Sequence, residues 1–191
     1  MANLFSILTL SLLIISLTSP ATGTFWKTKT VKSRSLKLKT AKLTRFQFYW
    51  HDIQSGSNPT SINIVKPVAA SRMNASTGFG VVNMIDDPLT FKPENGSKML
   101  GRAQGFYGMV SQEEYVLLMG MTFVFTVGRY SGSTLTVLGR NAVFQKVREM
   151  PVIGGTGLFR FARGYVQLTT HSVNMQTRDA IVRYNVCVLH Y

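Results

Sequence analysis

From Phe46 to its C-terminus, the chain alternates apolar and polar side chains with a period of two. At the start of this region Phe46, Phe48 and Trp50 fall on one face, and the side chains between them fall on the other. No window combines an apolar stripe of helical period with helix caps, so strands are the expected element throughout. We expect strands over residues 45–51, 61–66, 78–85, 102–110, 115–127, 133–138, 142–148, 158–170 and 179–191.

Short strands separated by turn residues favour an all-β sandwich or barrel. Roughly eight strands suit a small up-and-down barrel, whose interior holds one small ligand. Periodicity does not by itself separate a barrel from a sandwich. We expect Asp86-Asp87-Pro88 to halt the third strand, and Gly154–Gly157 to form a tight turn before the strand from Leu158.

The N-terminal region divides into two segments of different composition. Residues 4–17 are apolar and uncharged, and small residues follow around Ala21 and Gly23, which indicates a secretory signal peptide over residues 1–23. The run is shorter than the ~20 residues of a membrane helix, so we expect no membrane span. Residues 24–45 hold basic side chains and no acid, which predicts a flexible basic segment. Residues 46–191 then form the single domain.

The basic segment contributes much of the net charge of +13, and a run of this kind binds polyanions. Secretion and the absence of interleaved aromatics argue against nucleic acid, and acidic cell-wall polysaccharide is the expected partner. Secretion also fits the glycosylation sequons at Asn74 and Asn95. The lone cysteine, Cys187, lies in an apolar run and is expected to be a buried structural thiol.

Sites of conventional catalysis are absent from the sequence. His51, His171 and His190 show no ligand spacing, which argues against a metal site. No serine sits in a nucleophile elbow, and no cofactor fingerprint occurs. The glycine run at 154–157 precedes β-patterned sequence rather than a helix and a lysine, which argues against a phosphate loop.

Three segments together resemble the plant dirigent proteins: Phe48-Tyr49-Trp50-His51-Asp52-Ile53, the run from Gly101 to Tyr107, and the run from Val147 to Tyr165. Both glycine-rich runs place glycine turns beside β-rich sequence. The resemblance covers residues 46–191 and implies an eight-stranded antiparallel β-barrel of the dirigent and allene-oxide-cyclase type, associated as a trimer. It also implies action on phenolic intermediates with neither metal nor cofactor.

Asp52 ends the first expected strand of the domain. An aspartate at such a position commonly caps a turn by accepting backbone hydrogen bonds. At the mouth of an apolar barrel the same side chain has a raised pKa and exchanges a proton with a ligand. The resemblance favours the second interpretation, because Asp52 matches the catalytic acid in the His-Asp motif of the family.

Arg148 and Tyr107 are the other candidate catalytic residues. Arg148 either forms a local ion pair with Glu149 or points inward and holds a phenolate oxygen; adjacent strand residues face opposite sides, which favours the latter. Tyr107 either packs in the barrel or stacks on a phenolic ring. Both match pocket residues of the family, whereas Phe106 is expected to face outward.

Asn141 is a departure from the family pattern. The resemblance implies a second pocket aspartate there in lignan-forming members, and asparagine does not exchange a proton. Gly139-Arg140-Asn141 is similar to a branch that includes pterocarpan-forming enzymes. We expect Asn141, Tyr49 and Phe159 to contact the substrate, although Phe159 also suits the core or a subunit interface.

The resemblance implies stereocontrol over phenoxy-radical coupling, with radicals of coniferyl alcohol supplied by a separate laccase or peroxidase, giving optically active lignans. Two alternatives stay open. One is a pterocarpan-synthase-like dehydratase that closes an isoflavanol through a quinone methide, for which the single acid Asp52 suffices. The other is a protein of the apoplast that organises lignin deposition through its basic segment. The sequence does not decide whether the chain is an enzyme.

Overall fold

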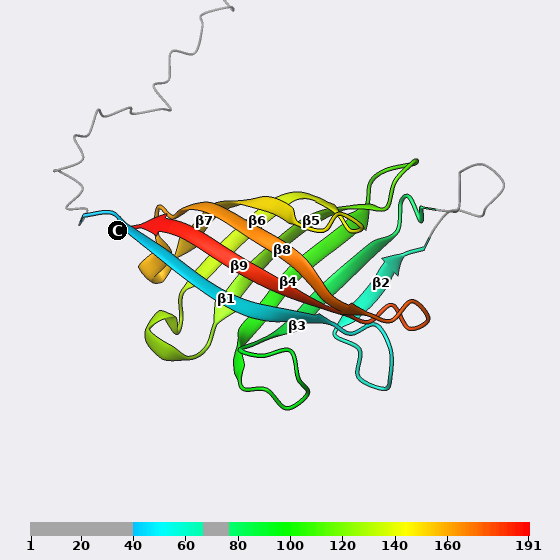
Figure 1. Cartoon of the computed structure of the whole chain (residues 1–191), viewed down its shortest axis with the longest axis horizontal. Helices are drawn as coiled ribbons and strands as arrows, with labels where there is room; N and C mark the ends of the chain where they lie inside the picture. Colours follow the sequence, from blue (N-terminus) through cyan, green and yellow to red (C-terminus); the bar gives the residue numbers. More distant parts are fainter. Residues whose placement is uncertain (1–39, 67–76) are drawn as a thin grey trace, which may run out of the picture. The chain divides into compact units, whose positions relative to one another are not determined.

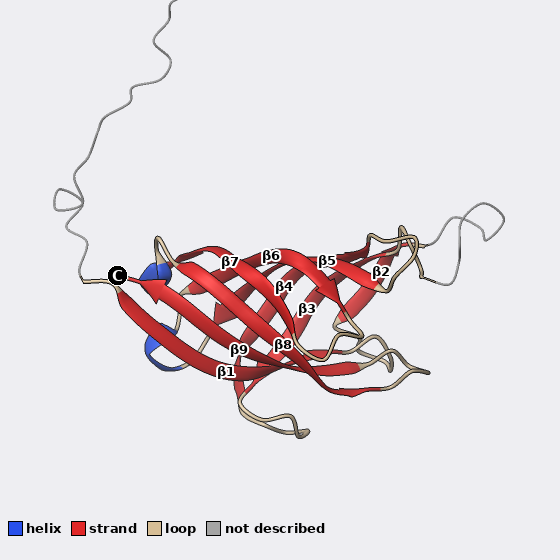
Figure 2. Cartoon of the chain, turned by 45° about the horizontal axis from the view of Figure 1, so that its top comes forward, coloured by secondary structure: helices blue, strands red, loops and turns tan. Residues whose placement is uncertain are grey.

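A computed structural model describes residues 40–66 and 77–191, so the predicted signal peptide and Asn74 lie outside the described residues. Nearly every element is a strand (Figures 1 and 2). The strands are β1 (Lys42–Asp52), β2 (Ser61–Val65), β3 (Val82–Thr90), β4 (Met99–Met109), β5 (Val116–Phe125), β6 (Thr134–Ala142), β7 (Arg148–Thr156), β8 (Arg163–Val173) and β9 (Ala180–His190), with 3-10 turns η2 (Gly128–Tyr130) and η3 (Gly157–Phe159).

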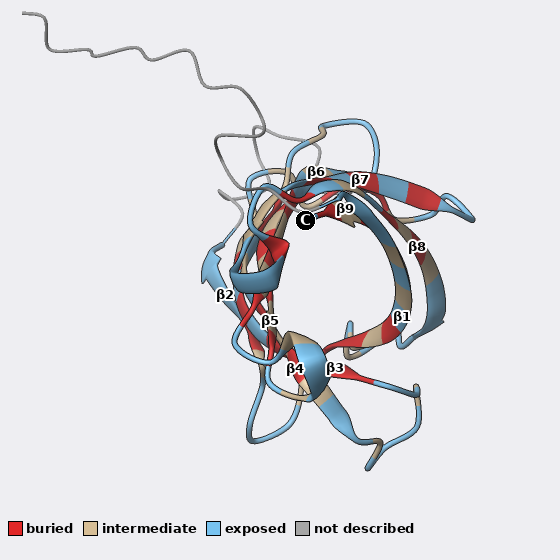
Figure 3. Ribbon diagram, turned by 90° about the vertical axis from the view of Figure 1, so that its left-hand side faces the viewer, coloured by how far each residue is buried: buried red, intermediate tan, exposed pale blue. Residues whose placement is uncertain are grey.

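The strands form a closed antiparallel barrel, as predicted. They pair in the order β1-β9-β8-β7-β6-β5-β4-β3-β2, and β1 also pairs with β3, which closes a ring of eight strands with β2 outside it (Figure 3). The β1–β3 seam is short, with the register Tyr49↔Thr90 and Trp50↔Leu89. In contrast, all 11 residues of β1 pair with β9.

The expectation that Asp86-Asp87-Pro88 halts the third strand is wrong, because β3 continues to Thr90. The Asp86 N–H points to the β2 side and donates to Thr60 O, so the ring nitrogen of Pro88 points the same way. Pairing with β2 ends at Ile85 and pairing with β1 begins at Leu89. Pro88 therefore occupies a gap in the ladder where no N–H is needed.

The expected strand over residues 142–148 is also wrong, because β7 only begins at Arg148. The tight turn expected over Gly154–Gly157 involves only its last residue, since β7 continues through Gly154 and Gly155 to Thr156. A Cβ on Gly155 would lie 2.5 Å from the Thr134 carbonyl oxygen, so glycine here allows a close approach of β6. The turn begins at Gly157, the residue after the end of β7, which has φ +61° and is the first residue of η3.

Aromatic side chains fill the barrel interior. The Phe48 ring stacks on Tyr184 with centroids 5.5 Å apart and meets Phe123 edge-on at 5.0 Å. Burial of each large apolar side chain contributes about 1.5–3 kcal/mol. The largest fully buried side chains are Tyr184, Phe48, Phe123, Phe125, Phe159, Leu89, Met119, Leu135, Met150 and Leu168.

The outer face carries the odd-numbered side chains of β1 and β9. Cys187 lies there, half-buried, and pairs in register with Arg45 and Tyr165, so the prediction of a buried thiol is wrong. The apolar neighbours of Cys187 in sequence alternate with it and take the inward positions instead. Phe106 faces outward and is 41% exposed, as expected.

No helix among the described residues is long and apolar enough to cross a bilayer.

Candidate functional site

The polar interior of the barrel begins where β1 and β3 separate. Their pairing ends at Trp50↔Leu89, and continuing the register by two residues brings Asp52 level with Asp87. Both side chains point inward and are buried. Thr60 and Ser61 enter between the two strands from the start of β2, because Asp86 N–H donates to Thr60 O. Two carboxyl groups and two hydroxyls therefore meet at this end of the barrel.

Asp52 has one bonded and one unpartnered carboxyl oxygen. Its Oδ2 accepts the Tyr107 hydroxyl at 2.9 Å and the Gln54 amide at 3.3 Å. Its Oδ1 is buried and has no hydrogen-bond partner among the described residues. Burial raises the pKa of Asp52, and the nearby hydroxyls of Ser61 and Tyr107 partly oppose this by favouring the charged form. A carboxyl group with a raised pKa keeps its proton to higher pH than an exposed one, so it can act as a proton donor as well as an acceptor.

Tyr107, on β4, is at the centre of a hydrogen-bond network. Its hydroxyl donates to Asp52 and accepts from Gln54 Nε2 at 2.9 Å and Asn83 Nδ2 at 3.0 Å, and Ser61 Oγ lies 3.0 Å away. Burial strongly raises the pKa of Tyr107, and the charge of Asp52 raises it further. The phenol therefore stays protonated and holds the Asp52 carboxylate in place.

Replacing Tyr107 by phenylalanine is expected to lower the free energy of unfolding by about 2 kcal/mol, because it removes the buried hydrogen bonds that the phenol donates to Asp52 and accepts from Asn83. Urea denaturation measures the change. Tyr115→Phe is the matched control, since that side chain is 43% exposed. Equal effects of the two substitutions would contradict a stabilising role for the network.

Asp87 is a buried acid that the sequence reasoning missed. It is fully buried, accepts the Thr60 hydroxyl at 2.5 Å, and its Oδ2 has no hydrogen-bond partner among the described residues. The Trp50 indole N–H favours the charged form of Asp87 but lies outside hydrogen-bonding geometry. Burial, followed by the charge of Asp52, raises the pKa of Asp87 to about 8. The signal in the sequence is the alternation of Asn83, Ile85, Asp87 and Leu89, which continues through the expected turn.

Arg148 begins β7 and points inward, whereas Glu149 bonds Gln167 on the exposed face at 3.2 Å. The Arg148 guanidinium donates to Val143 O and Thr170 Oγ1, both at 3.0 Å. Its Nε has no hydrogen-bond partner among the described residues. Burial lowers the pKa of Arg148, but an arginine side chain remains cationic. No carboxylate of the described residues forms an ion pair with Arg148, so its positive charge can bind an anionic oxygen of a ligand.

The aromatic ring of Tyr184, with Trp50 beside it, lies near both the carboxyl groups of Asp52 and Asp87 and the guanidinium of Arg148. Trp50 meets Tyr107 and Tyr184 edge-on, with ring centroids 6.4 and 6.2 Å apart. The pKa of Tyr184 is raised by burial and responds to the charges of Arg148, Asp52 and Asp87. Arg148 and Tyr184 are both in register with Leu168 of β8, so the rings of Trp50 and Tyr184 extend from Tyr107 toward the level of Arg148.

Inward-pointing polar atoms without partners gather in this part of the barrel. A buried polar atom left unpaired costs about 1–3 kcal/mol, so a cluster of them indicates a place for a polar ligand. Asn141 fits this description, because its Nδ2 lies 3.0 Å from Met119 Sδ while its Oδ1 is unpartnered. The unpartnered atoms of the cluster, within the described ranges, are Trp50 Nε1, Asp52 Oδ1, Asp87 Oδ2, Asn141 Oδ1, Arg148 Nε and Tyr184 Oη.

The structure does not bring Tyr49 and Phe159 to this cluster. Tyr49 is on the outward face of β1 and meets His171 edge-on at 5.7 Å. Phe159 is fully buried in η3, and its ring lies 6.3 Å from Phe46. Phe46 and Asp52 are separated by six residues of strand, which is about 20 Å. Phe159 therefore belongs to the opposite end of the barrel, where it packs on Tyr130.

The sequon asparagine Asn95 lies exposed in the connection between β3 and β4. Across residues 40–66 and 77–191, no three His, Cys, Asp or Glu side chains are grouped so as to hold a metal ion.

Comparison with known proteins gives consistent matches. The family model described as Dirigent-like protein matches residues 43–189. The chain is 45% identical to Dirigent protein 7 of Arabidopsis thaliana, covering 100% of both chains, and 42% identical to Pterocarpan synthase 1 of Glycyrrhiza echinata, covering 98% and 96%. The solved structure of the pterocarpan synthase dirigent protein GePTS1 aligns with a TM-score of 0.74 at 42% identity, over 86% of this chain and 89% of that one.

Proposed function

The chain belongs to the dirigent-like protein family, and from this premise we propose that it controls the stereochemistry of phenoxy-radical coupling inside its barrel. A separate oxidase, a laccase or peroxidase, supplies radicals of coniferyl alcohol, and the product is an optically active lignan. The observation that carries the proposal is the cluster of unpartnered inward polar atoms set among aromatic rings. Such an interior offers stacking surfaces for phenolic rings and hydrogen bonds for their oxygens.

Orientation is the main contribution of the protein. Two radicals held in one relative geometry form one stereoisomer, and fixing reactants in place is worth as much as about 7–11 kcal/mol. Coupling produces quinone methides, which close when a hydroxyl adds and its proton passes to the quinone oxygen. Asp52 relays this proton, Tyr107 positions Asp52, and Arg148 with Asn141 binds the phenolic oxygen.

A second candidate is a dehydratase that closes an isoflavanol to a pterocarpan. Asn141 favours it, because the interior lacks a carboxyl group at that position, and so does the similarity to the pterocarpan synthase GePTS1. Asp52 gives a proton to the leaving benzylic hydroxyl, the C–O bond breaks, and water departs. Arg148 holds the phenolate oxygen that becomes the quinone methide carbonyl. A second phenolic hydroxyl then adds to the benzylic carbon and returns its proton to Asp52.

Chiral chromatography of the products tests both candidates. The purified mature chain is incubated with coniferyl alcohol and a non-selective oxidase, and separately with an isoflavanol without oxidant. An enantiomeric excess that requires the protein supports radical coupling. Pterocarpan formation without oxidant supports the dehydratase instead. Racemic lignan together with unchanged isoflavanol would contradict both candidates.

The remaining expectations concern location and association. We expect secretion to the apoplast after removal of residues 1–23, glycans on Asn74 and Asn95, and assembly as a trimer. The basic segment would retain the protein on acidic wall polysaccharide and thereby organise lignin deposition. Because β1 already begins at Lys42, deletion of residues 27–39 removes most of the charge without entering the barrel. Unchanged retention on a pectate column would contradict this role.

A further inference from the structure

Closure through a quinone methide moves protons out of the site and back into it. Asp52 alone accounts for both transfers only when it starts protonated, and Asn141 does not exchange protons, so a group that supplies Asp52 with its proton would lie elsewhere in the barrel. We propose that Asp52 and Asp87 form a carboxyl dyad that shares one proton, and that Asp87 is the proton store from which Asp52 is recharged. The catalytic part of this inference rests on the proposed function, whereas the dyad is a property of the free protein.

The geometry of the two strands supports the dyad. Asp52 and Asp87 lie level in the β1–β3 register, point to the same interior and are 6% and 0% exposed. Each keeps one unpartnered carboxyl oxygen, within the part of the chain that the structure describes. The hydrogen bonds that they accept come from uncharged groups: Tyr107 and Gln54 for Asp52, and Thr60 for Asp87. Nothing in this arrangement neutralises two adjacent negative charges.

Groups from β1, β2, β4 and β9 surround Asp87. Asp52 on β1 repels its charged form, and Tyr107 on β4 is an uncharged phenol. Arg102, also on β4, favours the charged form weakly, because it binds Asp86 on the outer face at 2.5 Å. Tyr184 on β9 responds to both carboxyl groups. Residues 60 and 61, which lead into β2, supply hydroxyls only.

The electrostatics agree with this geometry. Two carboxylates that share a buried site do not ionise independently, and one of them keeps its proton well above the usual range. The pKa of Asp87 is raised to about 8, by burial first and by the charge of Asp52 second. At neutral pH the store is therefore filled.

The proton balance of the step closes. At the start Asp87 holds the one proton of the dyad and Asp52 is a carboxylate. Asp87 passes this proton to Asp52, which gives it to the leaving hydroxyl; the C–O bond breaks, water departs, and the held phenolate becomes a quinone methide. When the second phenolic hydroxyl adds to the benzylic carbon, the dyad accepts its proton, which returns to Asp87. The dyad ends as it began, and the substrate has lost one molecule of water.

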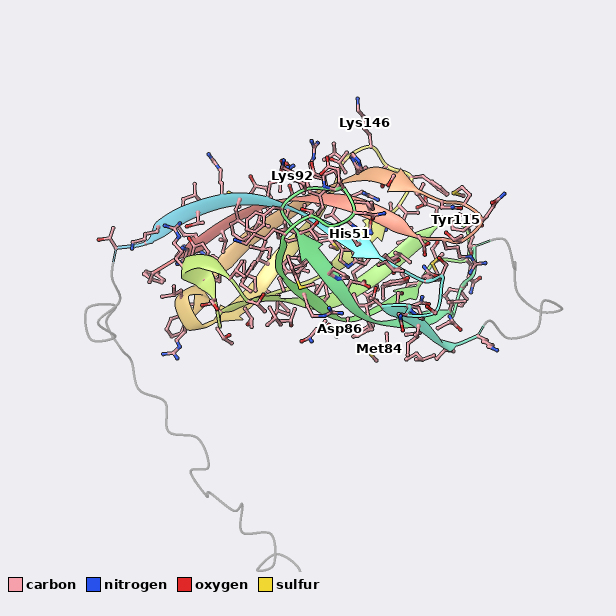
Figure 4. The ribbon with its side chains drawn as sticks, turned by 90° about the horizontal axis from the view of Figure 1, so that it is seen from below. His51, Met84, Asp86, Lys92, Tyr115 and Lys146 are labelled. Atoms are coloured by element: carbon pink, nitrogen blue, oxygen red, sulfur yellow. The ribbon has the colours of Figure 1, made fainter. Side chains whose placement is uncertain are left out.

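The dyad is tested first by titration without substrate, using the full mature chain. Carboxyl ¹³C NMR of aspartate-labelled protein should show a carboxyl group that titrates near pH 8. This titration should be absent in Asp87→Asn, shifted to lower pH in Asp52→Asn, and unchanged in Asp86→Asn. Asp86 is the matched control, because it is the preceding residue of β3 and lies on the outer face (Figure 4). A titration that persists in Asp87→Asn, or that does not move in Asp52→Asn, would overturn the dyad.

Thermal stability gives a second readout that needs no substrate. The folded state binds the Asp87 proton more tightly than the unfolded chain does, so this group loses stabilising effect as pH rises from about 4 to about 8. Asparagine resembles the protonated acid, so Asp87→Asn should match the parent Tm near pH 5 and exceed it near pH 9. Equal Tm values at pH 9 would contradict the raised affinity for the proton.

The role of the store in turnover is tested by a pH profile. With the substrate on which the parent protein is active, Asp87→Asn should lose the decline in activity near pH 8 and should slow the reaction about 10-fold or more. A profile identical to that of the parent would overturn the role of Asp87 while leaving the dyad intact. A parent protein that is inactive on both substrates contradicts the proposed function, and the titration still decides the dyad.

Discussion

Replacing Asp52 by asparagine is expected to abolish the activity, since general acid–base catalysis contributes about 10²–10⁴-fold in rate. In radical coupling the slowed proton transfer leaves the quinone methide in the barrel, while the oxidase continues to supply radicals that couple in free solution to racemic product. In dehydration the substrate remains. Asparagine keeps an oxygen that accepts hydrogen bonds from Tyr107 and Gln54, but it cannot relay a proton. A loss of activity in this variant therefore reports on proton transfer and not on a changed site geometry.

Two measurements accompany this substitution. The Tm should stay the same or rise, because a buried ionisable group with an unpartnered oxygen has been removed. Asp86→Asn serves as the control for an aspartate of the same barrel on the exposed face, and it should retain full stereoselectivity. A variant Asp52→Asn with unchanged enantiomeric excess would remove Asp52 from the mechanism.

Replacing Gly105 by alanine is expected to destabilise the barrel by about 3 kcal/mol. A Cβ at this position would lie 2.2 Å from the Gly120 carbonyl oxygen and 2.7 Å from the Met121 Cα. Both atoms belong to the backbone of β5, which no rotamer change can move, so β4 and β5 have to separate. Denaturation in urea measures the loss, as a lower midpoint.

Gly154→Ala is the matched control for Gly105→Ala. Gly154 also lies in a strand, but a Cβ there has nothing within 4 Å, so alanine should leave stability within about 1 kcal/mol of the parent or raise it slightly. A Gly105→Ala protein as stable as this control would show that the two strands adapt more easily than the backbone contact suggests.

The fold was largely predictable, because alternation survives in almost every strand. Alternation states which face a residue occupies but not its height along the barrel. Phe159 was therefore placed with the substrate although it packs at the other end, and Tyr49 was included although its own parity places it outside with Gln47. Gly101 was expected just before a strand and Gly105 within it, but nothing in the sequence indicated that both are needed where β5 approaches β4 closely. The spacing of residues along the sequence does not predict such contacts between neighbouring strands.

The site was partly predictable. Asp52, Tyr107, Arg148 and Asn141 all point into the same interior, and parity together with the family resemblance was sufficient to select them. Asp87 was missed because an Asp-Asp-Pro sequence has the chemistry of a turn. Only the tertiary structure shows that β2 stops pairing just before Pro88, which leaves room for proline within a strand.

The pairing of β1 along its full length with β9 has a consequence for biosynthesis. Lys42 pairs with His190 and Asp52 with Ala180, so the first strand of the barrel completes its ladder only with the last. A barrel emerging residue by residue from a ribosome or a translocation channel therefore cannot close until β9 is released. Until then β1 and β8 present open edges, which are sites of aggregation. Truncation by a few C-terminal residues should thus impair the yield of folded protein more than a deletion of similar length in a surface loop.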